Sequence, residues 1–260
     1  MPRFARNPAR LLTSCLLFLL PLAAGLAQVT ETPHTIAPGR IRFEMDGIRV
    51  SLDRADAAGN MYSATAVAST IVSTGLTDTV DLQAGIDLFV RQKVEFRGLS
   101  DRDSGLGDLL FRVKWTFWKD ERRGIAWAVI PYVRIPSRTG GIAQAQKGWG
   151  FIVPAEFDMG GGAILGAMFQ SDHTRDPNGG YDAAWTLSAY VSRPLTKRIG
   201  VYAESGVTLP SSGFSDAAGS IGAGVTYHLF EHLWFDYQLD RGLGDQASAW
   251  THTFRVNWEW

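Results

Sequence analysis

The sequence predicts an all-β protein, a transmembrane antiparallel up-and-down β-barrel of about twelve strands. Three observations predict this fold: an export signal at the start of the chain, segments of alternating apolar and polar residues after it, and connections that alternate between short and long. The last segment is the clearest, because Phe254, Trp258 and Trp260 share one parity while polar residues take the other. We expect this strand to close the barrel and to carry the signal read by the barrel-insertion machinery.

The first 27 residues predict a cleaved signal peptide. A basic stretch (3–10) precedes an apolar one (11–22), and small residues stand just before Gln28. A retained transmembrane helix is the alternative, but this apolar run is shorter than the roughly 20 residues that a helix needs to span a bilayer. We therefore expect a signal peptide over 1–27, a short N-terminal periplasmic segment over 28–39 and one outer-membrane barrel domain over 40–260.

Composition excludes several classes of function. Cys15 is the only cysteine and lies in the signal, so the mature chain has no disulfide, thiolate metal site or cysteine nucleophile. The signal also removes three of the 25 basic residues, which leaves 22 against 26 acidic ones and a net charge of 22 − 26 = −4. Such a chain has no basic surface for nucleic acid.

Alternation with period two defines the strands. It predicts strands near 40–53, 61–74, 79–95, 107–118, 124–136, 149–158, 162–171, 181–193, 199–209, 219–230, 232–240 and 248–260. Short turns follow every second strand, and longer polar loops fall near 54–60, 97–106, 137–148, 172–180, 210–218 and 241–247. Short periplasmic turns and long external loops produce this alternation in outer-membrane barrels.

The cost of placing a charge in lipid assigns the two faces. In the fourth strand Phe111, Val113 and Trp115 share one parity and Arg112 and Lys114 the other. A lipid-facing Arg or Lys at the middle of a bilayer costs roughly 2–4 kcal/mol, so the cations must point into the lumen. By the same rule the residues that we expect to line the transport pathway are Asp87, Arg112, Lys114, Arg134, Glu156, Asp236 and Arg255.

Some positions do not follow the simple pattern. Parity slips around Asp46 and Gly47, as a β-bulge would produce. Pro131 and Pro154 fall inside predicted strands, where a missing N–H predicts a bulge or a shorter strand. The aromatic residues Trp118, Tyr132, Tyr190 and Trp234 have inward parity and could meet an aromatic solute, although we favour places for them in the interfacial girdle.

Several short motifs, taken in order, resemble one known family. They are Ser73 to Asp78 leading into Val80 to Gly85, Ser104 to Asp108 running to Lys114, Ile135 to Ser137, and Leu239 to Asp245 before the last strand. The chain resembles the outer-membrane "putative MetA-pathway of phenol degradation" family over most of its mature length. The resemblance implies a transporter-like outer-membrane barrel linked to the uptake of small, often aromatic, molecules, and it does not fix a substrate.

Motifs for catalysis or metal binding are weak. An outer-membrane lipid hydrolase needs a nucleophile, a His base and an orienting group, and Ser248 and His252 are too far apart in one strand to pair. Asp101, Asp103 and Asp108 near a Gly-rich loop could coordinate calcium, but Asp108 is better explained as a turn residue that hydrogen-bonds its own backbone. We therefore expect no enzyme activity, no metal and no cofactor.

Two alternatives to a channel in the membrane remain. A soluble barrel or sandwich would show the same alternation but would bury its apolar face. This alternative is less favoured, because side chains can hardly fill the interior of a barrel of about twelve strands. A closed structural outer-membrane barrel, its charges paired across the interior, is the second alternative. The sequence favours an outer-membrane channel for small, aromatic or hydrophobic molecules, whose partners are outer-membrane lipid and a small-molecule solute.

Overall fold

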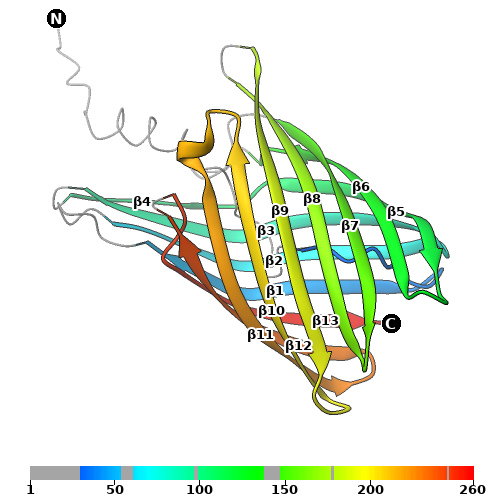
Figure 1. Ribbon diagram of the computed structural model, residues 1–260. Coiled ribbons are helices and arrows are strands. Elements are labelled where there is room, and N and C mark those ends of the chain that lie inside the picture. Colours follow the sequence, from blue (N-terminus) through cyan, green and yellow to red (C-terminus); the bar gives the residue numbers. More distant parts are fainter. Residues whose placement is uncertain (1–29, 54–60, 97–98, 138–146, 177–178, 245) are drawn as a thin grey trace, which may run out of the picture.

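The computed structural model describes residues 30–53, 61–96, 99–137, 147–176, 179–244 and 246–260 (Figure 1). Within these ranges nearly all of the chain is β-strand, apart from the short 3-10 helix η1 (Phe214–Asp216). The strands are β1 (Ile41–Leu52), β2 (Met61–Thr77), β3 (Val80–Phe96), β4 (Leu99–Gly105), β5 (Leu109–Asp120), β6 (Ile125–Ile135), β7 (Gly148–Gly160), β8 (Ala163–Arg175), β9 (Tyr181–Pro194), β10 (Ile199–Pro210), β11 (Ala218–Phe230), β12 (Leu233–Leu243) and β13 (Trp250–Glu259). No helix of the described residues is long and apolar enough to cross a membrane.

Twelve of the strands close into one antiparallel barrel, as the sequence predicts. Neighbouring strands pair in chain order, and β1 pairs with β13 from Arg42 opposite Glu259 to Leu52 opposite Trp250. At the end of this closing ladder Ile41 and Trp260 exchange two backbone hydrogen bonds of 3.0 Å. The terminal strand therefore seals the barrel.

The connections define two ends of the barrel. Tight turns follow β2, β5, β7, β9 and β11, and we call their side the short-turn end; the other side is the long-loop end. The first and last strands bring Ile41 and Trp260 together at the short-turn end. Each of the twelve predicted strands is present, with ends that differ by a few residues.

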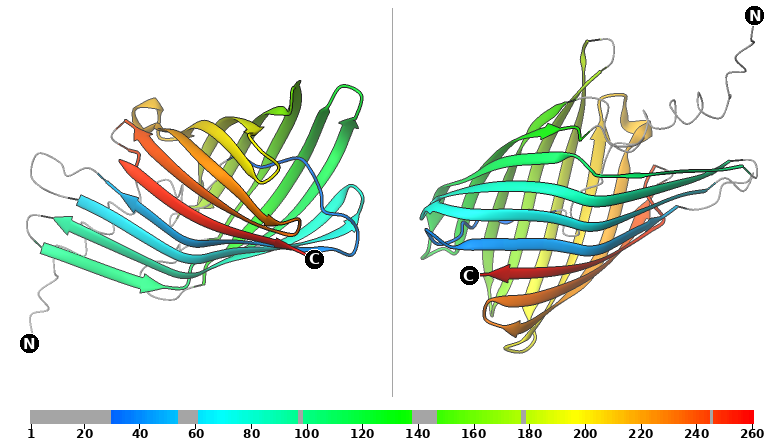
Figure 2. Two further views of the ribbon diagram at one scale, coloured as in Figure 1. Left: turned by 90° about the horizontal axis from the view of Figure 1, so that it is seen from below. Right: turned by 180° about the vertical axis from the view of Figure 1, so that it is seen from behind.

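One region at the long-loop end differs from the prediction. The loop expected over 97–106 contains a strand, β4, which pairs with the outer half of β3 from Val90 opposite Gly105 to Phe96 opposite Leu99. β5 pairs with β3 only as far as Ile86, so the rest of β3 has a free edge for β4 to occupy. Figure 2 shows β2, β3 and β4 running past the rest of the barrel as a three-stranded flap.

The predicted bulge and the two prolines are visible in the register. The pairing of β1 with β13 shifts between Asp46 and Ile48, which confirms the bulge. Of the two outcomes expected at Pro131 and Pro154, a bulge or a shorter strand, the shorter strand is not observed, because β6 and β7 run through the prolines. Instead the ladder skips pairs beside each proline, because a proline has no N–H to donate.

The two faces of the sheet differ as the alternation predicts. Phe111, Val113 and Trp115 on β5 are exposed, whereas Arg112 and Lys114 between them are buried. Exposed apolar side chains of this kind surround the barrel, and buried polar side chains point into it. This inside-out distribution is the one that a surrounding lipid phase requires.

Candidate functional site in the barrel lumen

The chain preceding β1 lies inside the barrel. Residues 30–38, called here the N-terminal segment, enter at the short-turn end and cross the lumen from β3 towards β9 and β10 (Figure 1, blue). At the entrance the backbone of the segment passes so close to Gly75 that a Cβ there would lie 2.5 Å from the Ala37 carbonyl oxygen. Pro33 and Ile36 are almost completely buried. The N-terminal segment is part of the stretch 28–39, which we expected to lie in the periplasm. Residues 30–38 of this stretch occupy the barrel lumen instead.

Glu31 of this segment pairs with two cations of the lumen wall. Its Oε1 accepts a 2.5 Å hydrogen bond from Nη1 of Arg112, and its Oε2 lies 3.8 Å from Nζ of Lys114. The Arg112 guanidinium also donates from Nε to Oε1 of Gln83 at 2.8 Å, which fixes its orientation. Charged groups so deeply buried are stable only when paired. The carboxylate of the segment therefore neutralises part of the lumen wall.

Other contacts hold both ends of the segment. His34 Nε2 lies 2.8 Å from Oε2 of Glu156, and the hydroxyl of Tyr190 donates to the other oxygen of that carboxylate at 2.6 Å. Near the start of the segment, the Thr30 amide donates to Oε1 of Glu204 at 2.7 Å. Near its end, the Ile36 amide donates to Asp81. With the hydroxyl of Ser188, which lies 2.6 Å from that of Thr30, polar side chains of five different strands thus bind one short stretch of chain.

A small apolar cluster adjoins these polar contacts. It consists of Ile130, Tyr132, Ile152 and Met168, all buried inside the barrel, with Leu110 packed against them. The Glu31 amide lies 3.3 Å from Sδ of Met168, so the segment also touches this cluster. In a lumen filled by water alone, inward isoleucine and methionine side chains would expose apolar surface to water. The wall therefore offers both charge and apolar surface at one level.

Three inward tyrosines each lie over a glycine of the neighbouring strand. They are Tyr132 over Gly150, Tyr190 over Gly166 and Tyr202 over Gly224, and a Cβ added at any of these glycines would lie less than 3 Å from the ring. Their hydroxyls bind Asp172, Glu156 and Gln238. Our preference for an interfacial place for Tyr132 and Tyr190 is therefore wrong, since both are buried in the lumen. Trp118 is about half exposed, and the Trp234 ring lies beneath the Arg42 guanidinium.

A second charged group lies on the wall made by β1, β12 and β13. Asp46 pairs with both Arg49 and Arg255, the latter through a 2.7 Å hydrogen bond from Nε. Asp236 accepts hydrogen bonds of 2.5 Å from Thr226 and 2.6 Å from Asn257. These contacts pair the charges of the wall with one another, although Nε of Arg49 and Nη2 of Arg255 are buried without a hydrogen-bond partner in the described part of the chain.

The structure therefore distributes the predicted site residues over several places. Arg112, Lys114 and Glu156 come together around the N-terminal segment. Arg134 pairs with Asp172 at 3.4 Å, and Asp87 is half-buried near Gly107, where β3 leaves β5. That these side chains line a transport pathway stays a prediction.

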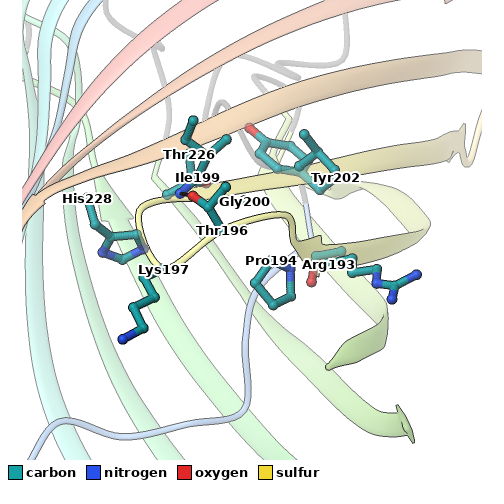
Figure 3. A pocket seen from close by; sticks show the side chains of 11 residues that line it. Arg193, Pro194, Thr196, Lys197, Ile199, Gly200, Tyr202, Thr226 and His228 are labelled. Carbon is teal, nitrogen blue, oxygen red and sulfur yellow. Dashed lines mark hydrogen bonds between the residues drawn. The ribbon is translucent and has the colours of Figure 1, made fainter. Parts of the chain in front are cut away.

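A cavity of about 260 Å³ opens at the short-turn end between β9, β10 and β11 (Figure 3). Ser192, Tyr202, Thr226 and His228 line it together with Lys197 of the turn. Figure 3 shows Lys197 and His228 on one side and Tyr202 on the other. In the described part of the chain no three His, Cys, Asp or Glu side chains are arranged to hold a metal ion.

Sequence reasoning missed the residues that the N-terminal segment contributes, above all Glu31 and His34. The segment contains two prolines and no alternation, so nothing local marks it as part of the site. One sequence signal could have placed the three tyrosines in the lumen. A glycine in the middle of a strand often marks the close approach of another group, and each tyrosine lies over such a glycine.

Comparison with known proteins supports the barrel. The family model described as "Putative MetA-pathway of phenol degradation" matches residues 24–260. No curated protein matches the sequence. Among solved structures, the COG4313 outer membrane channel from Pseudomonas putida F1 superimposes with a TM-score of 0.64 at 11% identity, covering 87% of this chain and 97% of that one.

Two further barrels are similar at lower scores. The translocator domain of the autotransporter NalP from Neisseria meningitidis has a TM-score of 0.52 at 10% identity, covering 87% of this chain and 89% of that one. The KdgM porin in complex with disordered oligogalacturonate has a TM-score of 0.51 at 6% identity, covering 85% and 98%. At these identities the similarity shows the fold.

Proposed function

Because the chain belongs to the family described as "Putative MetA-pathway of phenol degradation", we propose that it is an outer-membrane channel for small molecules with an aromatic or other apolar part. The family resemblance and a solved barrel described as an outer membrane channel support this proposal. In it, the short-turn end faces the periplasm and the exposed apolar band contacts outer-membrane lipid. Residues 1–27 are removed during export, and the last strand is read by the insertion machinery.

The observation that carries the proposal is the apolar cluster inside the lumen. Ile130, Ile152 and Met168 face inward, among polar side chains, on three successive strands. Burying these side chains stabilises the barrel only where something apolar covers them. A solute with an aromatic or aliphatic body can use the same surface as it passes.

A closed structural barrel is the second candidate function, and one observation favours it. The N-terminal segment is bound by the lumen wall from Thr30 to Ile36, and buried Pro33 receives a 2.5 Å hydrogen bond at its carbonyl from Thr116. If the segment stays in place permanently, it narrows the lumen too far for solutes. The two candidates therefore differ in whether the segment can move.

Single-channel recording in a planar bilayer tests the proposal. We expect the purified mature protein to give small conductance steps, and a variant that lacks residues 30–38 to give steps several-fold larger. Heat-modifiable migration of both proteins on a gel verifies that they are folded. Folded protein that gives no steps in either form would overturn the channel proposal and favour the closed barrel.

We further propose that the protein is not an enzyme. Ser171 and His173 form a Ser–His pair, with Oγ 3.0 Å from Nε2, but both lie on the outward face, and the His ring stacks on Trp149 at 4.1 Å. Among the described residues no acidic side chain orients this His, as a nucleophilic triad needs. Hydrolysis of phospholipid in detergent micelles by the purified protein would contradict this part of the proposal.

A further inference from the structure

We infer that Arg112, Lys114 and the apolar cluster form a binding site for a small carboxylic acid with an apolar body, and that Glu31 occupies this site when no ligand is bound. The inference rests on the proposed channel function and names the class of its substrate. The acid and the N-terminal segment would compete for the same cations, so binding of the acid would favour withdrawal of the segment.

The first step of the argument is that the site already holds a carboxylate. Arg112 and Lys114 are 4% and 3% exposed, and Glu31 is the acid that both approach among the described residues. Among the described residues, the other hydrogen-bond or ion-pair contact of Lys114 is a 3.4 Å hydrogen bond to the carbonyl of His34. Lys114 thus takes both of its contacts from the N-terminal segment.

The second step is that these contacts can be exchanged for those of a free ligand. Glu31 is not part of the barrel wall, and it reaches Arg112 across 81 residues of sequence. Gln83, which belongs to the wall, holds Nε of Arg112 and leaves Nη1 for the carboxylate. The guanidinium is thus oriented by the barrel itself, and an arginine fixed in this way is suited to bind a carboxylate from any source.

The third step concerns the body of the ligand. Tyr132 of the apolar cluster is the direct cross-strand partner of Arg112. The Glu31 amide lies against Met168 of the same cluster, so one residue of the segment covers both the charge and the apolar surface. A molecule that has a carboxylate at one end and an aromatic or aliphatic body at the other would replace both contacts.

The charges also explain why a neutral molecule is a poorer replacement. Withdrawal of Glu31 without a new anion leaves Arg112 and Lys114 without the carboxylate that pairs with both of them, and removing one partner of a buried ion pair is strongly unfavourable. An uncharged aromatic compound covers the apolar cluster but cannot compensate these charges. Acetate compensates the charges but leaves the cluster bare. We therefore expect affinity to need both parts of the ligand.

Calorimetric titration of the purified, folded mature protein with sodium benzoate tests this inference. Benzamide, which has the same shape without the charge, and acetate, which lacks the ring, are the control ligands. We expect Glu31→Gln to raise the affinity for benzoate about 10- to 100-fold, because the site is no longer occupied by the chain's own carboxylate. Benzamide and acetate should bind at least about tenfold more weakly than benzoate, a difference of roughly 1.4 kcal/mol or more.

Two further variants locate the site. In the Glu31→Gln background, Arg112→Gln should abolish the gain in benzoate affinity. Arg42→Gln is the matched control, since Arg42 is another cation of the barrel wall, paired at 2.6 Å with Glu259, and its loss should leave the gain intact. If Arg112→Gln does not fold, Lys114→Gln in the same background replaces it.

The possible outcomes separate the inference from the channel proposal. Equal benzoate affinity in the wild type and in Glu31→Gln, or equal affinity for benzoate and benzamide, would overturn the inference. If the variant lacking 30–38 nevertheless conducts, the channel proposal stands without it. Absence of conductance in every folded form would instead refute the channel itself, whatever the binding of benzoate.

Discussion

Replacing Gly166 by Ala should destabilise the barrel by about 2–4 kcal/mol. An added Cβ would lie 2.5 Å from Cζ and 2.7 Å from Cδ1 of the Tyr190 ring, closer than van der Waals contact allows. Overpacking of this kind costs roughly 1–3 kcal/mol. The ring cannot move freely, because its hydroxyl holds Glu156 at 2.6 Å, and a hydrogen bond to a charged group contributes roughly 1.5–3 kcal/mol, part of which would be lost.

Gly200→Ala is the matched control for this change. Gly200 lies near the start of β10 in the same sheet, and a Cβ there would meet its nearest atoms at 3.8 Å from Thr226 and 3.9 Å from Arg193, which is ordinary contact. Because glycine weakens a strand by roughly 0.5–1 kcal/mol relative to Ala, this substitution should be neutral or slightly stabilising.

The assay is urea titration of the barrel in lipid vesicles, followed by heat-modifiable migration. A Tyr190→Ala background adds a second test, since without the ring the Gly166→Ala penalty should largely disappear and the two changes should couple by about 1–3 kcal/mol. Equal stabilities of Gly166→Ala and Gly200→Ala would refute the reasoning, because the ring would then not be held against the glycine.

Three further predictions concern the lipid face, the closure and the lumen. Val113→Arg should cost about 2–4 kcal/mol in the same titration, because it turns a charge towards lipid, and Val113→Leu should be tolerated; similar stabilities would contradict the face assignment. Deletion of Trp260 removes the two backbone hydrogen bonds to Ile41 and should sharply lower the yield of heat-modifiable protein in membranes, so a normal yield would argue against its role in closure. Arg112→Glu with Lys114→Glu should repel Glu31, enlarge the conductance steps and shift the reversal potential in a salt gradient towards cation selectivity. Unchanged ion preference would show that the two residues do not line the route.

The fold was predictable because each of the twelve strands that close the barrel shows its own alternation of apolar and polar residues. Apolar Val113 and charged Lys114 are neighbours in the sequence, so their side-chain types alone assign them to the lipid face and the lumen face. The alternation from Phe254 to Trp260 assigns the faces of the closing strand in the same way. β4 was missed because its sequence is almost entirely polar and does not alternate. It is a strand only because β3 continues beyond the last residue that pairs with β5.

The site was less predictable, because its key contacts join distant parts of the chain. Arg112, Lys114 and Glu156 could be placed in the lumen from parity, but their partners Glu31 and His34 come from a stretch without periodicity. The pairing of carboxylates with cations in the lumen depends on the curvature of the closed barrel. A local sequence pattern therefore cannot predict these pairs.

The position of the N-terminal segment also sets an order of events during folding. Thr30 lies early in the sequence, yet the side chains that bind it, Ser188 and Glu204, lie 158 and 174 residues further along the chain. Contacts at such separations form slowly, because the chain between them must first be ordered. The segment can therefore dock only after β9 and β10 stand in the wall. Refolding should show closure of the barrel first and protection of the segment from protease in a separate, later phase.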